Sequence, residues 1–153
     1  MALLSDEVCP RSKEIECLER YLELVPPDPR DIEVSKLALG MLYVEEGRLS
    51  EAINILQAVE LEDAESQKRI TLGRAFLAAE QYEMAVEQLK PVSVLRAKKD
   101  ASDKQEAKYW LGVTYAESGK NSLAKKHLGA VYSSDANYRD VSRYANEMGF
   151  AVL

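Results

Sequence analysis

Ala107–Val131 reads AKYWLGVTYAESGKNSLAKKHLGAV, and its order of small and apolar residues occurs twice more in the chain. The other copies are Ser35–Val59, SKLALGMLYVEEGRLSEAINILQAV, and Lys68–Val92, KRITLGRAFLAAEQYEMAVEQLKPV. Six columns agree in residue type: Leu39/Leu72/Leu111, Gly40/Gly73/Gly112, Tyr43/Phe76/Tyr115, Ala52/Ala85/Ala124, Leu56/Leu89/Leu128 and Val59/Val92/Val131. The copies begin 33 and then 39 residues apart, which is a spacing typical of repeat proteins.

Each copy predicts two helices, because its first three columns and its last three columns each form one apolar stripe with a period near 3.6. Gly47 and Gly119 separate the two stripes, where a helix end favours a residue that tolerates positive φ. Glu80 takes that place in the middle copy, so we expect another turn conformation there, or strain. The small columns predict close helix packing, with the glycine of the first helix facing the alanine of the second.

Further signals predict where helices begin and end. Asp28 before Pro29 predicts a capped helix start, and Ser102 with Gln105 has the spacing of a capping box. Pro91 predicts a break near Lys90, because proline lacks the amide hydrogen that an inner turn donates.

The second spacing is six residues longer than the first, and the extra residues fall in Arg96–Lys104. We expect this segment to be a longer loop or an extended helix end. Its cations Arg96, Lys98, Lys99 and Lys104 favour a solvated loop over contact with an acidic partner.

The six columns resemble the tetratricopeptide repeat (TPR) family, whose helix-turn-helix unit has 34 residues. The resemblance implies an all-α fold, a right-handed superhelical array of antiparallel helix pairs, in one domain spanning 1–153. An earlier partial unit is indicated by Cys17, Tyr21, Leu24 and Pro29, which have the spacing of a second helix and its terminating proline. The expected units are a partial repeat at 10–29, repeats at about 33–63, 66–96 and 105–134, and a capping helix at about 137–150.

The resemblance also implies a concave groove lined by the first helix of each pair, where a peptide or helix of another protein binds. The candidate groove residues are Leu37, Met41, Val44, Ile70, Arg74, Leu77, Tyr109, Trp110, Val113 and Ala116. Apolar residues at helical spacing are also typical of an ordinary core, so these residues are either covered by the chain itself or a second copy, or form an open groove. The lysine- and asparagine-rich clamp that grips chaperone tails is missing, since only Arg74 could contribute to it.

The leading hypothesis is therefore a non-enzymatic scaffold that binds a protein partner. One alternative is a structural segment of a larger TPR protein or a self-associating array, and a further one is an acidic secretion-type chaperone. Discriminating observations would be partner capture that depends on Arg74 and Trp110, or a mass that changes with concentration.

Composition narrows these classes. With 26 acidic and 20 basic residues the net charge is −6, which disfavours nucleic acid and anionic membranes as partners. Cys9 and Cys17 would lie roughly 12 Å apart on one helix, so free thiols and a cytoplasmic location are expected, with Cys17 buried. No apolar run is long enough to span a membrane.

Catalysis, cofactors and metals find no support in the sequence. His127 is the sole histidine and is interpreted as a surface or half-buried helical residue. The acidic group Glu60, Glu62, Asp63 and Glu65 lacks the alternating ligands of a calcium loop and is interpreted as favouring a helix N-terminus.

Overall fold

The computed structural model describes residues 10–24 and 26–150, and all regular structure in them is helical. The α-helices are α1 (Arg11–Glu23), α2 (Pro29–Glu45), α3 (Leu49–Gln57), α4 (Glu65–Ala78), α5 (Tyr82–Ser93), α6 (Ala101–Glu117), α7 (Asn121–Ser134) and α8 (Val141–Met148). Short 3₁₀ helices, η2 (Glu62–Ala64) and η3 (Lys98–Asp100), lead directly into α4 and α6. The prediction of an all-α chain is confirmed.

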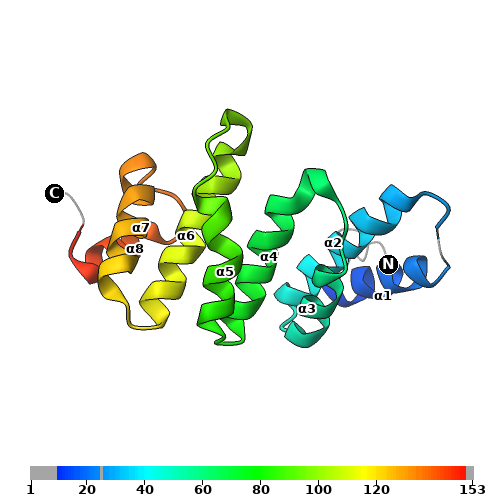
Figure 1. Cartoon of the computed structure of the whole chain (residues 1–153). Coiled ribbons are helices and arrows are strands. Elements are labelled where there is room, and N and C mark those ends of the chain that lie inside the picture. The colour runs from blue at the N-terminus through cyan, green and yellow to red at the C-terminus, as the bar shows by residue number, and fades with distance from the viewer. Residues whose placement is uncertain (1–9, 25, 151–153) are drawn as a thin grey trace, which may run out of the picture.

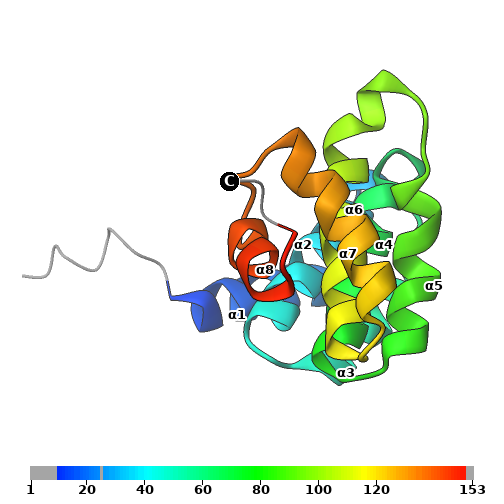
Figure 2. The same cartoon turned by 90° about the vertical axis from the view of Figure 1, so that its left-hand side faces the viewer.

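Neighbouring helices pack side by side in an elongated row (Figure 1). The three sequence copies form the pairs α2–α3, α4–α5 and α6–α7, and we call α2, α4 and α6 the first helices and α3, α5 and α7 the second helices. Each first helix packs on its own second helix; α4 and α6 also pack on the second helix before them, and α2 and α4 pack on the next first helix. Seen along the row, α1 and α8 lie on one side and α5 on the other (Figure 2).

Glycine lets the two helices of each pair approach closely, but its nearest side chain is not the predicted alanine. A Cβ atom on Gly40, Gly73 or Gly112 would lie 2.5 Å from the Cγ of the leucine sixteen residues later. These leucines are Leu56, Leu89 and Leu128, each 0% exposed. The alanine column is also fully buried, but the leucine is what enters the space that glycine leaves. A leucine fits there because its branched end reaches across to the facing backbone, which an alanine methyl cannot do.

The turn between the two helices of each pair has the same backbone in all three copies. Gly47, Glu80 and Gly119 have φ values of 78°, 59° and 81°. In each turn the next amide donates to the carbonyl of the aromatic column, at 2.8 Å, in the pattern of a Schellman motif. Of the two outcomes expected for Glu80, the structure has the strained one, since a side chain is disfavoured in this left-handed conformation.

Of the two predicted helix starts, one is confirmed and the other is wrong. The Asp28 carboxylate accepts a hydrogen bond from the Arg30 amide at 2.9 Å, so the capped start of α2 is confirmed. The capping box at Ser102 is wrong, because η3 continues into α6 at Ala101 and places Ser102 inside the helix without a side-chain cap.

The expected break near Lys90 is also wrong. Helix α5 continues through Pro91 and ends at Ser93, whose hydroxyl donates to the Lys90 carbonyl at 2.7 Å. The helix tolerates Pro91 because it stands one turn from the end on an exposed face. The extra residues before α6 form η3 and the additional length of α6, which is the extended-helix alternative rather than a loop.

Two clusters of buried side chains form the core. The N-terminal core comprises Ile15, Leu39, Tyr43, Ala52, Leu56, Leu72, Ala75, Phe76 and Ala85. The C-terminal core comprises Ile70, Leu89, Val92, Ala107, Tyr109, Leu111, Val113, Tyr115, Ala124, Leu128, Val131, Val141 and Tyr144. Helix α4 contributes to both, and its partly buried Leu77 packs against each of them. Among the described residues, no helix has the length and apolarity that crossing a membrane requires.

Helix α1 packs on α2 with a different face from the one predicted. Ile15 is 1% exposed, and Leu18 and Leu22 pack against the N-terminal core. Cys17 is exposed, which corrects the expectation that it is buried; Cys9 lies outside the described residues. Tyr21 and Leu24 are exposed as well, so the stripe that suggests a partial repeat is not the face that packs against the N-terminal core.

Candidate functional site

The ten predicted groove residues do not share one environment. Ile70, Tyr109 and Val113 are buried in the C-terminal core, with 1%, 4% and 6% of their surface exposed. The other seven are partly exposed: Leu37, Met41, Val44, Arg74, Leu77, Trp110 and Ala116. The prediction therefore combines core positions with surface positions, as its two alternatives allowed.

The chain itself covers the α6 portion of the predicted groove. The rings of Tyr138 and Tyr144, from the C-terminal segment, lie edge-on to Tyr109 with centroids 5.7 and 6.4 Å away. Arg139 lies 5.4 Å above the Trp110 ring and pairs with Glu106 at 3.1 Å. These contacts cover Tyr109 and part of Trp110.

Arg74 takes part in the same packing, through a contact with the Trp110 ring. Its guanidinium lies 4.9 Å from the centre of the Trp110 ring, so Trp110 contacts a cation from Arg74 as well as from Arg139. The Trp110 Nε1 is buried and makes no hydrogen bond to any described residue. The one charge expected to meet a ligand is thus partly exposed and in contact with Trp110.

The open part of the predicted groove is at the other end of the row, between α1 and α2. A cavity of about 520 Å³ is lined there by Glu14, Cys17, Leu18, Ala38, Met41 and Leu42. We call it the α1–α2 pocket. Its walls are mostly apolar. The Glu14 carboxylate is the charged group in the lining, and the Cys17 thiol is its one reactive group.

The place of this pocket in the packing pattern shows what shape it fits. A first helix packs on its own second helix and on the next first helix, as α4 does on α5 and α6. By its order in the chain α1 corresponds to a second helix, and α2 is the next first helix. A helix paired with α1 would therefore contact α1 and α2 together, which are the two walls of the α1–α2 pocket.

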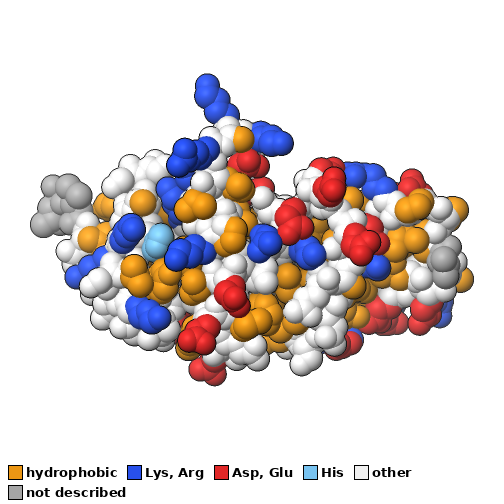
Figure 3. All heavy atoms as spheres, viewed as in Figure 1, with side chains coloured by type: hydrophobic (Ala, Val, Ile, Leu, Met, Phe, Trp, Pro, Cys, Tyr) orange, Lys and Arg blue, Asp and Glu red, His pale blue; other side chains and the backbone are white. Residues whose placement is uncertain are grey.

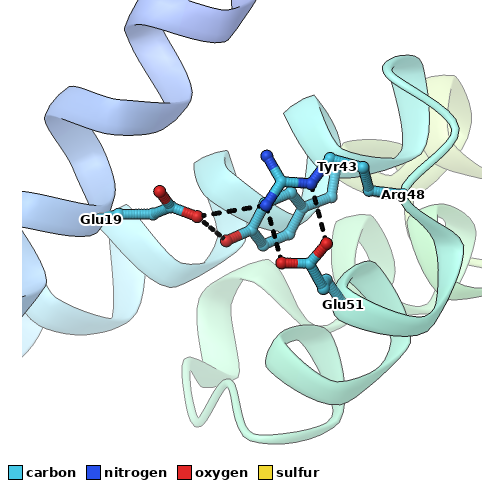
Figure 4. A network of polar contacts seen from close by, with 4 residues as sticks. All are labelled: Glu19, Tyr43, Arg48 and Glu51. Atoms are coloured by element: carbon cyan, nitrogen blue, oxygen red, sulfur yellow. Dashed lines mark hydrogen bonds and ion pairs between the residues drawn. The ribbon is translucent and has the colours of Figure 1, made fainter.

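A polar network holds α1 in place beside this pocket (Figure 4). The Tyr43 hydroxyl donates to Glu19 of α1 at 2.5 Å, and Arg48 binds Glu51 of α3 through two hydrogen bonds of 2.7 and 2.8 Å. The Arg48 guanidinium lies 4.6 Å from the Tyr43 ring centre. Burial and the Glu19 carboxylate raise the pKa of Tyr43 to about 12, and the hydrogen bond from Arg48 lowers the pKa of Glu51.

The residues weighed for metal or catalytic roles have structural surroundings. In residues 10–24 and 26–150 there is no cluster of three or more His, Cys, Asp or Glu side chains able to hold a metal ion. Asp63 pairs with Arg30 of the preceding unit at 2.9 Å, and Glu65 lies in the first turn of α4. His127 is half-buried and stacks on Tyr115 with ring centres 5.5 Å apart.

Comparison with models of known families, with curated proteins and with solved structures finds no match for this chain.

The sequence did not predict several residues that shape the two ends of the helix row. On α1 and α2 the prediction missed Leu18, Ala38 and Leu42 of the pocket, because it assigned the wrong face of α1 to packing. At the other end it missed Arg139, whose backbone lies in the left-handed region at φ 43°. Nothing in the three aligned copies could reveal Arg139, since it belongs to none of them.

Proposed function

We propose that the chain is a TPR-like protein-interaction scaffold, a right-handed superhelical array without catalytic activity, that binds a helix of a partner protein in the α1–α2 pocket. The observation that carries the proposal is the pocket itself: an apolar cavity of about 520 Å³ whose two walls stand where the packing pattern would seat one more helix. The three matching Gly–Leu contacts and the three matching turns support the repeat assignment.

The chemistry of the pocket favours an amphipathic helix. Met41, Leu18 and Leu42 offer adaptable apolar contacts, which a helix meets with residues spaced three and four apart. Glu14 at the rim favours a basic residue next to that stripe. This occupant deepens the sequence-based hypothesis, because a cavity is present at the N-terminal end of the predicted groove, beside Met41.

The exposed Cys17 permits a direct test, because a reagent on its thiol would touch the occupant. In a Cys9→Ser background, a thiol-linked photocrosslinker on Cys17 should capture one partner segment from the source cells, and sequencing the adduct identifies it. Met41→Glu should abolish capture, because it places a charge against the apolar wall. Asn54→Glu, on the exposed face of α3, should retain it.

Circular dichroism must show that both variants are folded. Capture that persists in a folded Met41→Glu variant would reject the pocket as the binding site.

The same geometry supports a second candidate, in which the occupant is a helix of a second copy or of a longer array. Under that alternative the adduct would contain this chain's own sequence. Sedimentation equilibrium over a hundredfold concentration range would then show a mass that rises with concentration in the wild type and stays constant in Met41→Glu.

A further inference from the structure

A second surface lies between α5 and α7, which pack on α6 rather than closely on one another. One part of it is a cavity of about 380 Å³ lined by Ser93, Val94, Arg96, Lys104, Lys108, Lys126, His127 and Ala130. The other is a cavity of about 670 Å³ lined by Tyr82, Glu83, Met84, Val86, Glu87, Tyr115, Ser118, Lys120 and Leu123. The stacked rings of Tyr115 and His127 join the two, and we call the whole the α5–α7 groove.

The first cavity is basic in an acidic protein. It carries Arg96, Lys104, Lys108 and Lys126, and no carboxylate is among its lining residues. None of these four cations has a carboxylate of the described residues within 4.0 Å. Figure 3 shows the basic side chains around the histidine on this face of the molecule.

The basic cavity lies in the more basic half of the chain. Residues 1–65 contain 16 acidic and 6 basic residues, whereas residues 66–153 contain 10 acidic and 14 basic residues. Like charges on one cavity lining repel one another, and no carboxylate lines this cavity to offset that repulsion. An external anion would offset it.

The groove also exposes apolar side chains. Val94 is 64% exposed, and Met84 and Leu123 are each 39% exposed. Val94 lines the basic cavity, while Met84 and Leu123 line the other one. The surface therefore has a basic end and an end where Met84 and Leu123 are exposed beside Glu83 and Glu87.

We propose that the α5–α7 groove binds a short extended segment of a partner protein that carries several carboxylates at one end and a large apolar side chain at the other. The carboxylates lie against Lys104, Lys108 and Lys126, and the apolar side chain contacts Met84 and Leu123. Charge complementarity favours this occupant, since the four cations form no ion pair within the described chain and Met84 and Leu123 are each 39% exposed.

The length of the segment follows from α6, which forms the floor. Lys104 and Tyr115 are eleven residues apart on this helix, so they are roughly 16 Å apart along its axis. An extended chain covers that distance with about five residues. This surface is separate from the α1–α2 pocket and does not depend on the function proposed for it.

The test uses a fluorescein-labelled ten-residue peptide with two leucines followed by four glutamates, and a control peptide in which glutamine replaces the glutamates. The wild-type chain should bind the first peptide and should bind the control about tenfold more weakly. Lys126→Glu should weaken binding of the acidic peptide by at least about tenfold, because it reverses a charge inside the groove. Lys125→Glu makes the same change one residue away, outside the lining, and should alter binding less than about twofold.

His127 gives an independent readout, because it is the only histidine and its ring signal in NMR spectra needs no assignment. Binding of the acidic peptide should raise its pKa and shift its ring signals. Leu123→Ser should weaken binding of the peptide. At saturating peptide, the change in the pKa of His127 should be the same as in the wild type.

Four results would overturn the proposal. They are no binding of the acidic peptide at millimolar concentration, equal losses in Lys125→Glu and Lys126→Glu, the same histidine shift with inorganic phosphate alone, and self-association that Lys126→Glu abolishes. The third would indicate a site for simple anions, and the fourth would indicate a second copy as the occupant. Binding in the α1–α2 pocket is unaffected by any of these outcomes.

Discussion

Gly73 faces Leu89 so closely that a methyl group on the glycine would lie 2.5 Å from the leucine Cγ. The same contact joins Gly40 to Leu56 and Gly112 to Leu128, so one steric rule fixes the separation of the two helices in every unit. It is the most specific link in this chain between a sequence column and a three-dimensional contact.

We expect Gly73→Ala to lower the free energy of unfolding by about 1–3 kcal/mol, because Leu89 must leave its rotamer or the helices must separate. Urea denaturation monitored by circular dichroism measures the loss. Gly129→Ala is the matched control: Gly129 is inside α7, and a Cβ there would meet nothing within 4 Å. That variant should gain about 0.5–1 kcal/mol from the better helix propensity of alanine. Equal effects of the two substitutions would contradict the steric rule.

Glu80→Gly should stabilise the chain by up to about 1 kcal/mol, since Glu80 has a φ of 59° and glycine adopts this conformation without strain. Gly47→Ala should do the reverse at the equivalent turn, where φ is 78° and a side chain has room but a strained backbone. Thermal and urea unfolding of both variants check the pair. A destabilised Glu80→Gly would show that the Glu80 side chain makes a compensating contact.

The pKa of His127 should lie below its ordinary value of 6.5, because burial disfavours the charged ring and Lys126, Lys108 and Lys90 add repulsion. The unfolded chain then binds the proton more tightly than the folded chain, so the contribution of His127 to stability is lost as pH falls through 6.5. NMR titration of the ring protons measures the pKa directly. The stability of His127→Gln should fall less than that of the wild type between pH 7.5 and pH 5.5, and identical pH profiles would contradict the burial of the ring.

The raised pKa of Tyr43 predicts a loss of stability at alkaline pH. Its pKa of about 12 exceeds the ordinary value of 10.0, so the folded chain favours the neutral phenol. Its contribution to stability is present in full below pH 10 and is lost as the pH rises toward 12. Melting temperatures at pH 9 and pH 11 should therefore differ more in the wild type than in Tyr43→Phe. At neutral pH the variant should also loosen α1, because the hydrogen bond to Glu19 is removed.

Most of the fold could be predicted from the repeated sequence columns. Leucine, glycine and aromatic residues in three aligned copies predicted three helix pairs, and the structure places a pair at each of them. The partner of the glycine could not be predicted, because column spacing gives the face of a helix but not how far a side chain reaches across it. Pro91 and Ser102 were misjudged for a related reason: the energies at helix ends are small, and neighbouring turns override them.

The proposed binding surfaces were less predictable from the sequence. On α1, Ile15–Leu18–Leu22 and Cys17–Tyr21–Leu24 are both apolar stripes at helical spacing, and only the packing against α2 distinguishes them. The closure over Trp110 depends on Arg139, which lies outside the repeats. The basic cavity joins Arg96 and Lys104 to Lys126, and its formation requires α5, α6 and α7 to be assembled.

Leu77 borders both cores, and α4 and α5 each give buried side chains to both, so the row has two compartments that meet along this helix pair. Fluctuations that open α1–α3 need not open α6–α8, so native-state hydrogen exchange should resolve two protection levels, with the boundary within α4 and α5. A ligand in the α1–α2 pocket would slow exchange in the first compartment, and a ligand in the α5–α7 groove would slow it in the second. One short chain could in this way hold two partners whose affinities are set almost independently.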